Sequence, residues 1–252
     1  MASLNAIVDY TNELLAVSQF NDYCPNGLQV QGRPEVHRLI GGVTASRDLL
    51  DAAIAADADA ILVHHGYFWK GEDAAITGMK YERIRRLIDA GIALLAYHLP
   101  LDAHPEYGNN AQLGRLLGVS ISGGFALRAN IPIACHGHLT EPLRHADLSD
   151  RLEAVLQRSP LCIQGHERRI ERIGWCTGAA QGYIDEAAAL GLDAFISGEI
   201  SEHTYHAARE LGISYYAAGH HATERYGVMA LGQHLSECFD LEFSFKDLPN
   251  PV

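Results

Sequence analysis

Ile61-Leu62-Val63-His64-His65-Gly66 is the stretch of this sequence that decides the fold. Its apolar, branched residues predict a buried strand of a parallel sheet, and the run ends abruptly at two imidazoles and a glycine. In open α/β sheets, ligands bind just beyond the carboxyl ends of the strands. The His pair therefore marks a candidate metal site at this edge of the predicted sheet.

A second His pair, His220-His221, also follows a strand-like run, at 213–219. A chain of 252 residues with 14 histidines contains about one such pair by chance. The position of both pairs after predicted strands, and not their number, therefore supports a site.

The two halves of the sequence resemble each other. AIAADADAILVHHG at 53–66 is echoed by AAALGLDAFISGEI at 187–200. Each segment has an Ala-rich helix end, then Asp-Ala, then an apolar strand and a polar terminus. Similar strand-like runs flank both segments, at 39–45 and 173–179 upstream and at 91–98 and 212–219 downstream. The pattern predicts βαβ units with right-handed crossovers in each half; the alternative is chance similarity between Ala-rich segments.

We therefore predict an α/β fold of two similar α/β lobes, with mainly parallel sheets and a metal site in the cleft between them. The boundary is placed at the small residues 120–124, which gives a first lobe of 1–124 and a second of 125–252. The C-terminal segment can still pack back on the first lobe. Residues 128–142 are rich in Pro and His and predict an irregular segment. The alternation in 241–245 predicts a half-buried edge strand.

Composition excludes several classes of protein. The net charge is −12, from 19 basic and 31 acidic residues, and no basic stripe is present, which argues against a nucleic-acid partner. The five cysteines are scattered without a CxxC motif, which argues against a disulfide framework or a zinc ribbon and fits a reducing compartment. The N-terminal residues predict an amphipathic helix, and no apolar run is long enough for a membrane. We predict a cytoplasmic protein with no membrane partner.

Residues that can bind metal recur where predicted strands end. Asp102 follows the strand at 92–97, and His220 with Glu224 follows the strand at 213–217. If a helix begins near His220, its side chain and that of Glu224 lie on one face. Imidazole and carboxylate suit divalent first-row ions, and no thiolate is placed to compete.

The first His pair favours two ions over one. Adjacent residues of a regular strand face opposite ways, so His64 and His65 reach one cavity only if the strand has broken. Even then they suit two neighbouring ions, which need an anionic bridge to offset their repulsion. Any single histidine at a strand end is more simply a polar cap; the shared placement of the whole set argues for metal.

Several short motifs are spread in order over nearly the whole chain: NGLQV at 26–30, GVTAS at 42–46, VHHGYFWKG at 63–71, YHLPLDAH at 97–104, NNA at 109–111, SGE at 197–199 and GHHATE at 219–224. Together they resemble the Nif-three-like family of dinuclear metal-centre hexameric proteins, whose members are often named GTP cyclohydrolase 1 type 2. The resemblance implies a homo-hexamer with two divalent metal ions per chain (Zn, Fe, Mn, Ni or Co). The ligands it implies are His64, His65, Asp102, His220 and Glu224.

The resemblance also implies a dinuclear metal-dependent hydrolase that opens the purine ring of GTP or a related nucleotide with hydroxide generated at the metals. A second group must protonate the departing nitrogen. The candidates are His98, Glu199, which takes the place of His65 in the second half, and His203, which follows another strand terminus. No Gly-rich phosphate loop is present, so Lys70 or Arg225 would bind the phosphates.

Other functions remain open. Simple phosphoester or amide hydrolysis of a small-molecule substrate fits the same ligands. The alternative from another class is a metal-binding hexameric scaffold or regulatory protein without dedicated catalysis. A structural metal centre closes its ligand shell, whereas an enzyme leaves a coordination position open. A serine hydrolase is disfavoured, because the sequence has no Gly-x-Ser-x-Gly elbow.

Overall fold

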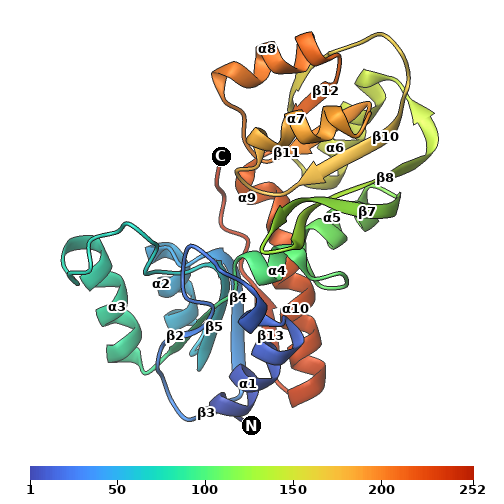
Figure 1. Cartoon of the computed structure of the whole chain (residues 1–252). Coiled ribbons are helices and arrows are strands. Elements are labelled where there is room, and N and C mark those ends of the chain that lie inside the picture. The colour runs from blue at the N-terminus through green and yellow to red at the C-terminus, as the bar shows by residue number, and fades with distance from the viewer. The chain divides into compact units, whose positions relative to one another are not determined.

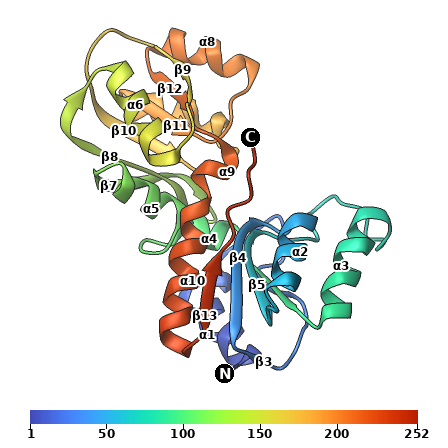
Figure 2. The same cartoon turned by 180° about the vertical axis from the view of Figure 1, so that it is seen from behind.

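The computed structural model describes residues 1–252, which fold into two compact α/β units (Figure 1). Unit 1 comprises 1–108 and 227–249, and unit 2 comprises 109–226 and 250–252. The reverse view in Figure 2 shows the C-terminal helix and strand that belong to unit 1. No helix of the chain has both the length and the apolar character needed to cross a membrane.

Unit 1 is built on a five-stranded sheet in the order β13-β4-β5-β6-β2. The strands β13, β4, β5 and β6 run parallel, and β2 is antiparallel to β6. The strands of this unit are β1 (Ala2–Ser3), β2 (Gly27–Val30), β3 (Glu35–Val36), β4 (Arg38–Thr44), β5 (Ala60–His65), β6 (Ala93–Ala96) and β13 (Glu242–Phe245). Its helices are α1 (Leu4–Leu14), η1 (Val17–Gln19), α2 (Arg47–Ala55), α3 (Gly78–Ala90), α4 (Leu99–Ala103) and most of α10 (Arg225–Phe239).

The central strands of unit 1 are apolar because both faces of the sheet are covered. Leu39 and Leu62 belong to one cluster with residues of α1 and α10. Their neighbours Ile40 and Ile61 point the other way, into a second cluster with residues of α2 and α3. A strand buried on both faces has no polar alternation, which is why 61–63 reads as a continuous apolar run. The edge strand β13 is only half buried, as predicted.

Unit 2 has a six-stranded sheet in the order β7-β8-β10-β11-β12-β9. Only β10, β11 and β12 run parallel, and the other pairings are antiparallel. Its strands are β7 (Val119–Arg128), β8 (Ile131–Leu143), β9 (Leu161–Ile163), β10 (Ile170–Cys176), β11 (Ala194–Ser197) and β12 (Ser214–Ala217). Its helices are α5 (Asn109–Leu116), α6 (His145–Leu156), η2 (Gln181–Tyr183), α7 (Ile184–Ala189), α8 (Glu202–Leu211) and α9 (His220–Thr223).

The long β7–β8 hairpin overturns two expectations. The α/β class is confirmed, but a mainly parallel sheet is right only for unit 1. Residues 128–142, predicted to be irregular, lie almost entirely in β8, whose Pro132 sits opposite Leu127 near the tip of the hairpin. Both partners of this hairpin are local in sequence, so an antiparallel pairing forms without a crossover.

The units divide the chain at 108/109, and not at 124/125 as the predicted lobes 1–124 and 125–252 would have it. The small residues 120–124 are no linker, because they lie within β7 and pair with β8. The C-terminal segment completes unit 1: β13 pairs with β4, and the ring of Phe243 occupies the space that a side chain at Gly41 or Gly232 would fill.

The internal repeat is present in the structure down to individual hydrogen bonds. In each unit three consecutive parallel strands lie side by side, β4-β5-β6 and β10-β11-β12. The Asp before the middle strand, Asp59 or Asp193, accepts two backbone N–H groups from the start of the first strand and an arginine side chain, Arg33 or Arg168. Burial acts to raise the pKa of both aspartates, but these hydrogen bonds lower it overall. The shared arrangement argues for a true repeat over chance similarity.

Candidate metal centre

Three histidines of unit 1 gather at the carboxyl ends of β5 and β6. His64 and His65 are the last residues of β5, and His98 caps α4 directly after β6. One ring nitrogen from each lies within 4.8 Å of the others. The rings of the His pair are 4.6 Å apart although both residues belong to the strand. The predicted break in the strand is therefore not needed, because both residues lie at the carboxyl end of β5.

Each imidazole of the pair is oriented by a second group. His64 is fully buried, and its Nδ1 lies 2.9 Å from the carbonyl oxygen of Tyr97. A carbonyl only accepts, so Nδ1 donates and Nε2 faces the Asp102 carboxylate, 3.5 Å away. Thr44 Oγ1 lies 3.1 Å from Nδ1 of His65. Ligating histidines are typically held this way through the nitrogen that does not bind the metal.

Unit 2 places an imidazole between two carboxylates. His220 begins α9, with Nδ1 2.7 Å from Glu199 Oε1 and Nε2 3.1 Å from Glu224 Oε2. The predicted helix start and the shared face of His220 and Glu224 are confirmed. Burial acts to lower the pKa of His220, but the carboxylates of Glu224 and Glu199 raise it to about 9. The ring and the buried Glu224 form a donor set that suits a divalent cation.

Gly178 completes this arrangement through the absence of a side chain. It follows β10, and its φ of +69° lies in the left-handed region. A Cβ at this position would overlap Glu224 Oε1 and lie 3.2 Å from His220 Nε2. In the repeat, Gly178 takes the place of Thr44, the last residue of β4, which contacts His65. The same repeat position therefore borders the candidate ligands in each unit.

The remaining predicted residues have different surroundings. Glu199 lies beside His220 and is part of the cluster. His203 lies exposed in the first turn of α8, and the structure does not bring it to the cluster. The Arg225 guanidinium donates to the Leu156 carbonyl oxygen at 2.7 Å and so packs within unit 2. Lys70 is exposed.

Sequence reasoning missed Asp22, whose Oδ1 lies 2.8 Å from Nδ1 of His98. No strand or motif marks Asp22, and 76 residues separate it from His98. The NGLQV segment, whose Asn26-Gly27 reads most simply as a turn, gave an indirect signal. Its Asn26 accepts the backbone N–H of His98, and its Gln29 accepts that of Tyr67 after the His pair.

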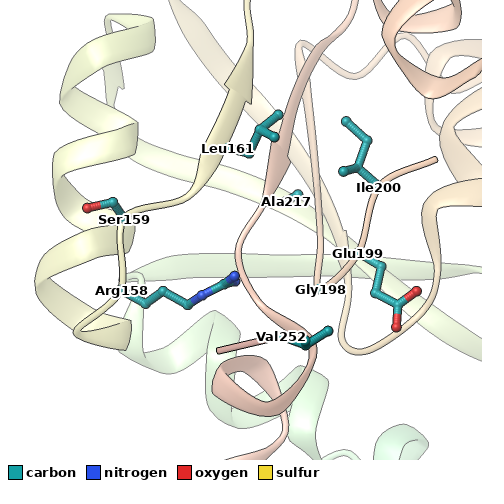
Figure 3. A pocket seen from close by; sticks show the side chains of 8 residues that line it. All are labelled: Arg158, Ser159, Leu161, Gly198, Glu199, Ile200, Ala217 and Val252. Carbon is teal, nitrogen blue, oxygen red and sulfur yellow. The ribbon is translucent and has the colours of Figure 1, made fainter. Parts of the chain in front are cut away.

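A pocket of about 360 Å³ in unit 2 adjoins this cluster through Glu199 (Figure 3). Apolar side chains and one cation, Arg158, form much of its wall. Its lining residues are Arg158, Ser159, Leu161, Gly198, Glu199, Ile200, Ala217 and Val252. Arg158 Nη2 donates to the carbonyl oxygen of Pro251 at 2.7 Å. Glu199 thus connects the His220 imidazole with a cavity large enough for a small organic molecule.

Comparison with known proteins identifies the family of this chain. A relative from Pseudomonas aeruginosa named GTP cyclohydrolase 1 type 2 homolog is 53% identical over 250 residues, 99% of each chain. A protein of the same name from Escherichia coli strain K12 is 51% identical over 96% of each chain. The solved structure titled protein ybgI, of unknown function, matches with a TM-score of 0.95, 49% identity and full coverage of both chains.

A second solved structure, TTHA1606 from Thermus thermophilus, matches with a TM-score of 0.91, 32% identity and full coverage of both chains. HcgD from Methanocaldococcus jannaschii shares the fold at a TM-score of 0.84 and 21% identity, over 97% of each chain. The model of the family Duf34/NIF3 (NGG1p interacting factor 3) matches residues 2–251. The chain therefore belongs to the Duf34/NIF3 family.

Proposed function

We propose that this protein is a metal-dependent hydrolase with a dinuclear centre, acting on GTP or a related small molecule. The observation that carries the proposal is the oriented donor set at the strand ends of both units. In unit 1 the Nε2 atom of His64 faces Asp102; in unit 2 His220 faces Glu224. Neutral imidazole and carboxylate are the ligands that divalent first-row ions take in hydrolases.

We further propose that the residues that would hold the two ions are His64, His65, Asp102, His220 and Glu224. Five protein ligands for two ions leave coordination positions open. Open positions favour an enzyme over a structural centre.

When bound, two divalent ions supply Lewis acidity and make hydroxide available near neutral pH. The side chains of the chain itself do the rest. Glu199 holds His220 by its Nδ1, and Thr44 holds His65, so both rings keep their orientation. His98 lies beside the pair, where it can take up or release a proton. Trp69, 4.9 Å from the His98 ring, flanks this space with an aromatic surface.

The names of the relatives support GTP as the first substrate to test, with opening of the purine ring by attack at C8 and loss of formate. One observation argues against GTP. The Arg225 guanidinium is bonded to the Leu156 carbonyl oxygen, so Lys70 alone remains of the two residues predicted to bind the phosphates. Simpler phosphoester or amide hydrolysis fits the same groups. A metal-binding scaffold or regulator without catalysis is the second candidate.

We also propose, from the resemblance, a homo-hexamer. The five free cysteines support a cytoplasmic protein.

The test is metal analysis of the purified protein beside Asp102→Ala and Glu224→Ala, with Glu202→Ala as the matched control because Glu202 is an exposed acid on α8. We expect about two ions per chain in the wild type and the control, and a sharp loss in both site variants. A hydrolysis screen with GTP, other nucleotides, phosphoesters and amides follows, with and without a chelator. Unchanged metal content in the variants would refute the site. GTP turnover that survives full chelation would refute the mechanism, and a loaded protein inactive in the screen would favour the scaffold.

A further inference from the structure

Asp22 is a buried carboxylate whose hydrogen bonds converge on the segment that carries His98. Its side chain is only 3% exposed. Oδ1 lies 2.8 Å from His98 Nδ1 and accepts the N–H of Tyr23, and Oδ2 accepts the N–H of Leu99 at 2.9 Å and the Asn26 side chain at 2.8 Å. Asn26 in turn accepts the backbone N–H of His98 at 2.7 Å. Asp22 thus holds the ring of His98, and Asn26, itself held by Asp22, holds the backbone of the same residue.

A metal ion bound by Asp22 itself is the competing explanation, because Asp22, Cys24 and His98 offer ligand atoms within 4.8 Å of one another. Two observations oppose it. Burial, and then the charge of Asp22, raise the pKa of the Cys24 thiol to about 12, so the thiolate that a metal requires is disfavoured. The Asp22 oxygens already accept four hydrogen bonds, which an ion would have to displace.

The geometry instead assigns Asp22 as the positioning residue of His98, an inference that rests on the proposed hydrolase function. An ionised carboxylate only accepts hydrogen bonds, so Nδ1 of His98 must be the donor. Nε2 of His98 then carries no hydrogen and keeps a free lone pair. The rings of His64 and His65 lie beside this imidazole, with centroids 5.1 and 5.8 Å away. A histidine fixed in this tautomer presents an acceptor for the proton of an attacking water.

The step that follows is balanced in atoms and charge. Water oxygen forms a bond to the electrophilic carbon or phosphorus of the substrate, and its proton passes to Nε2 of His98. The imidazolium so formed keeps its Nδ1–H on Asp22. Nε2 then returns the proton to the departing nitrogen or oxygen as that bond breaks. Asp22 exchanges no proton; it fixes the tautomer and stabilises the transient positive charge.

The tautomer is measurable without a substrate. In protein labelled with ¹⁵N-histidine and loaded with Zn²⁺, long-range ¹H–¹⁵N spectra distinguish Nδ1–H from Nε2–H, and the His98→Gln variant identifies the His98 signals. We expect the Nδ1–H tautomer in the wild type and a shift toward Nε2–H in Asp22→Asn, whose amide can donate. An Nε2–H tautomer in the wild type, or no change in Asp22→Asn, would overturn the inference.

The matched control is Asp59→Asn. Asp59 is another carboxylate of unit 1 that accepts backbone N–H groups, but it contacts the starts of β4 and β5 and not His98. If Asp59→Asn moves the His98 signals as far as Asp22→Asn does, the effect is general loss of structure and the positioning role is refuted. If Asp22→Asn fails to fold, Asp22→Glu takes its place as the variant, and the tautomer of His98 in the wild type still tests the inference by itself.

On a substrate found in the screen, we expect Asp22→Asn to lower kcat about 10²–10⁴-fold with KM nearly unchanged. Metal content should equal that of the wild type, because Asp22 is not a proposed ligand. Loss of metal in Asp22→Asn would refute a role confined to His98. Absence of metal in the wild type would refute the proposed function and leave the tautomer result standing.

Discussion

Replacement of Gly178 by alanine tests the metal centre through a residue that carries no ligand atom. A Cβ at Gly178 would lie 2.1 Å from Glu224 Oε1, whereas ordinary contact begins at 3.4 Å. The carboxylate must therefore retreat by about 1.3 Å, far more than the ~0.2 Å tolerance of a metal–ligand distance. We expect the affinity for the ion that Glu224 binds to fall at least ~10-fold, about 1.4 kcal/mol.

Gly191→Ala is the matched control. Gly191 has the same φ of +69°, but the nearest atom to its would-be Cβ is Arg172 Nη1 at 3.4 Å. Both variants should lose about 1–2 kcal/mol through left-handed backbone strain, seen as a fall of a few degrees in Tm. Only Gly178→Ala should lose metal, measured by isothermal titration of the chelated protein with Zn²⁺ or Mn²⁺. Equal metal affinity in the two variants would refute the assignment of Glu224 as a ligand.

Three further predictions address stability. Asp193→Asn removes a carboxylate that accepts two backbone N–H groups, and this should lower the free energy of unfolding by about 2 kcal/mol at pH 7. Because the folded pKa of Asp193 is lowered, its contribution is full above the unfolded value and is lost as pH falls through the folded one. Urea unfolding should therefore show a smaller difference in the free energy of unfolding between Asp193→Asn and the wild type at pH 3 than at pH 7. An equal difference at both pH values would contradict this pH dependence. Trp175→Phe removes the fully buried donor to the Asn110 carbonyl oxygen, 2.8 Å away, and should cost about 2–4 kcal/mol; a loss below about 0.5 kcal/mol would show that the pair is not stabilising. Chelation should lower the Tm of the wild type by mass action but not that of Asp102→Ala, and an equal shift in both would place the metal elsewhere.

The parts of the fold that sequence predicted best are those encoded locally. A branched apolar run predicted β5, and a strand-like run that contains two tyrosines predicted β12. The strand ends then placed the ligand candidates, because a parallel sheet aligns its carboxyl ends at one edge. The repeat added Glu199 by correspondence, and the structure puts it against His220.

The parts that could not be predicted depend on contacts far apart in sequence. Nothing near Asp22 indicates that it meets His98, and the role of Gly178 appears only once Glu224 lies against it. The unit boundary failed for a related reason. Small residues usually mark a linker, but in β7 they allow close strand packing: a side chain at Gly124 would overlap Pro132 of β8.

Because β13 and α10 complete unit 1 from the far end of the chain, the sheet that the ribosome begins first receives its last strand only after residues 109–226 have been made. Residues 109–226 emerge in between and can fold while β4 still exposes an unpaired edge. Such an edge recruits other strands until it is covered. A nascent chain stalled before residue 242 should therefore be prone to aggregation, and a fragment ending at Gly108 would make a poor independent domain.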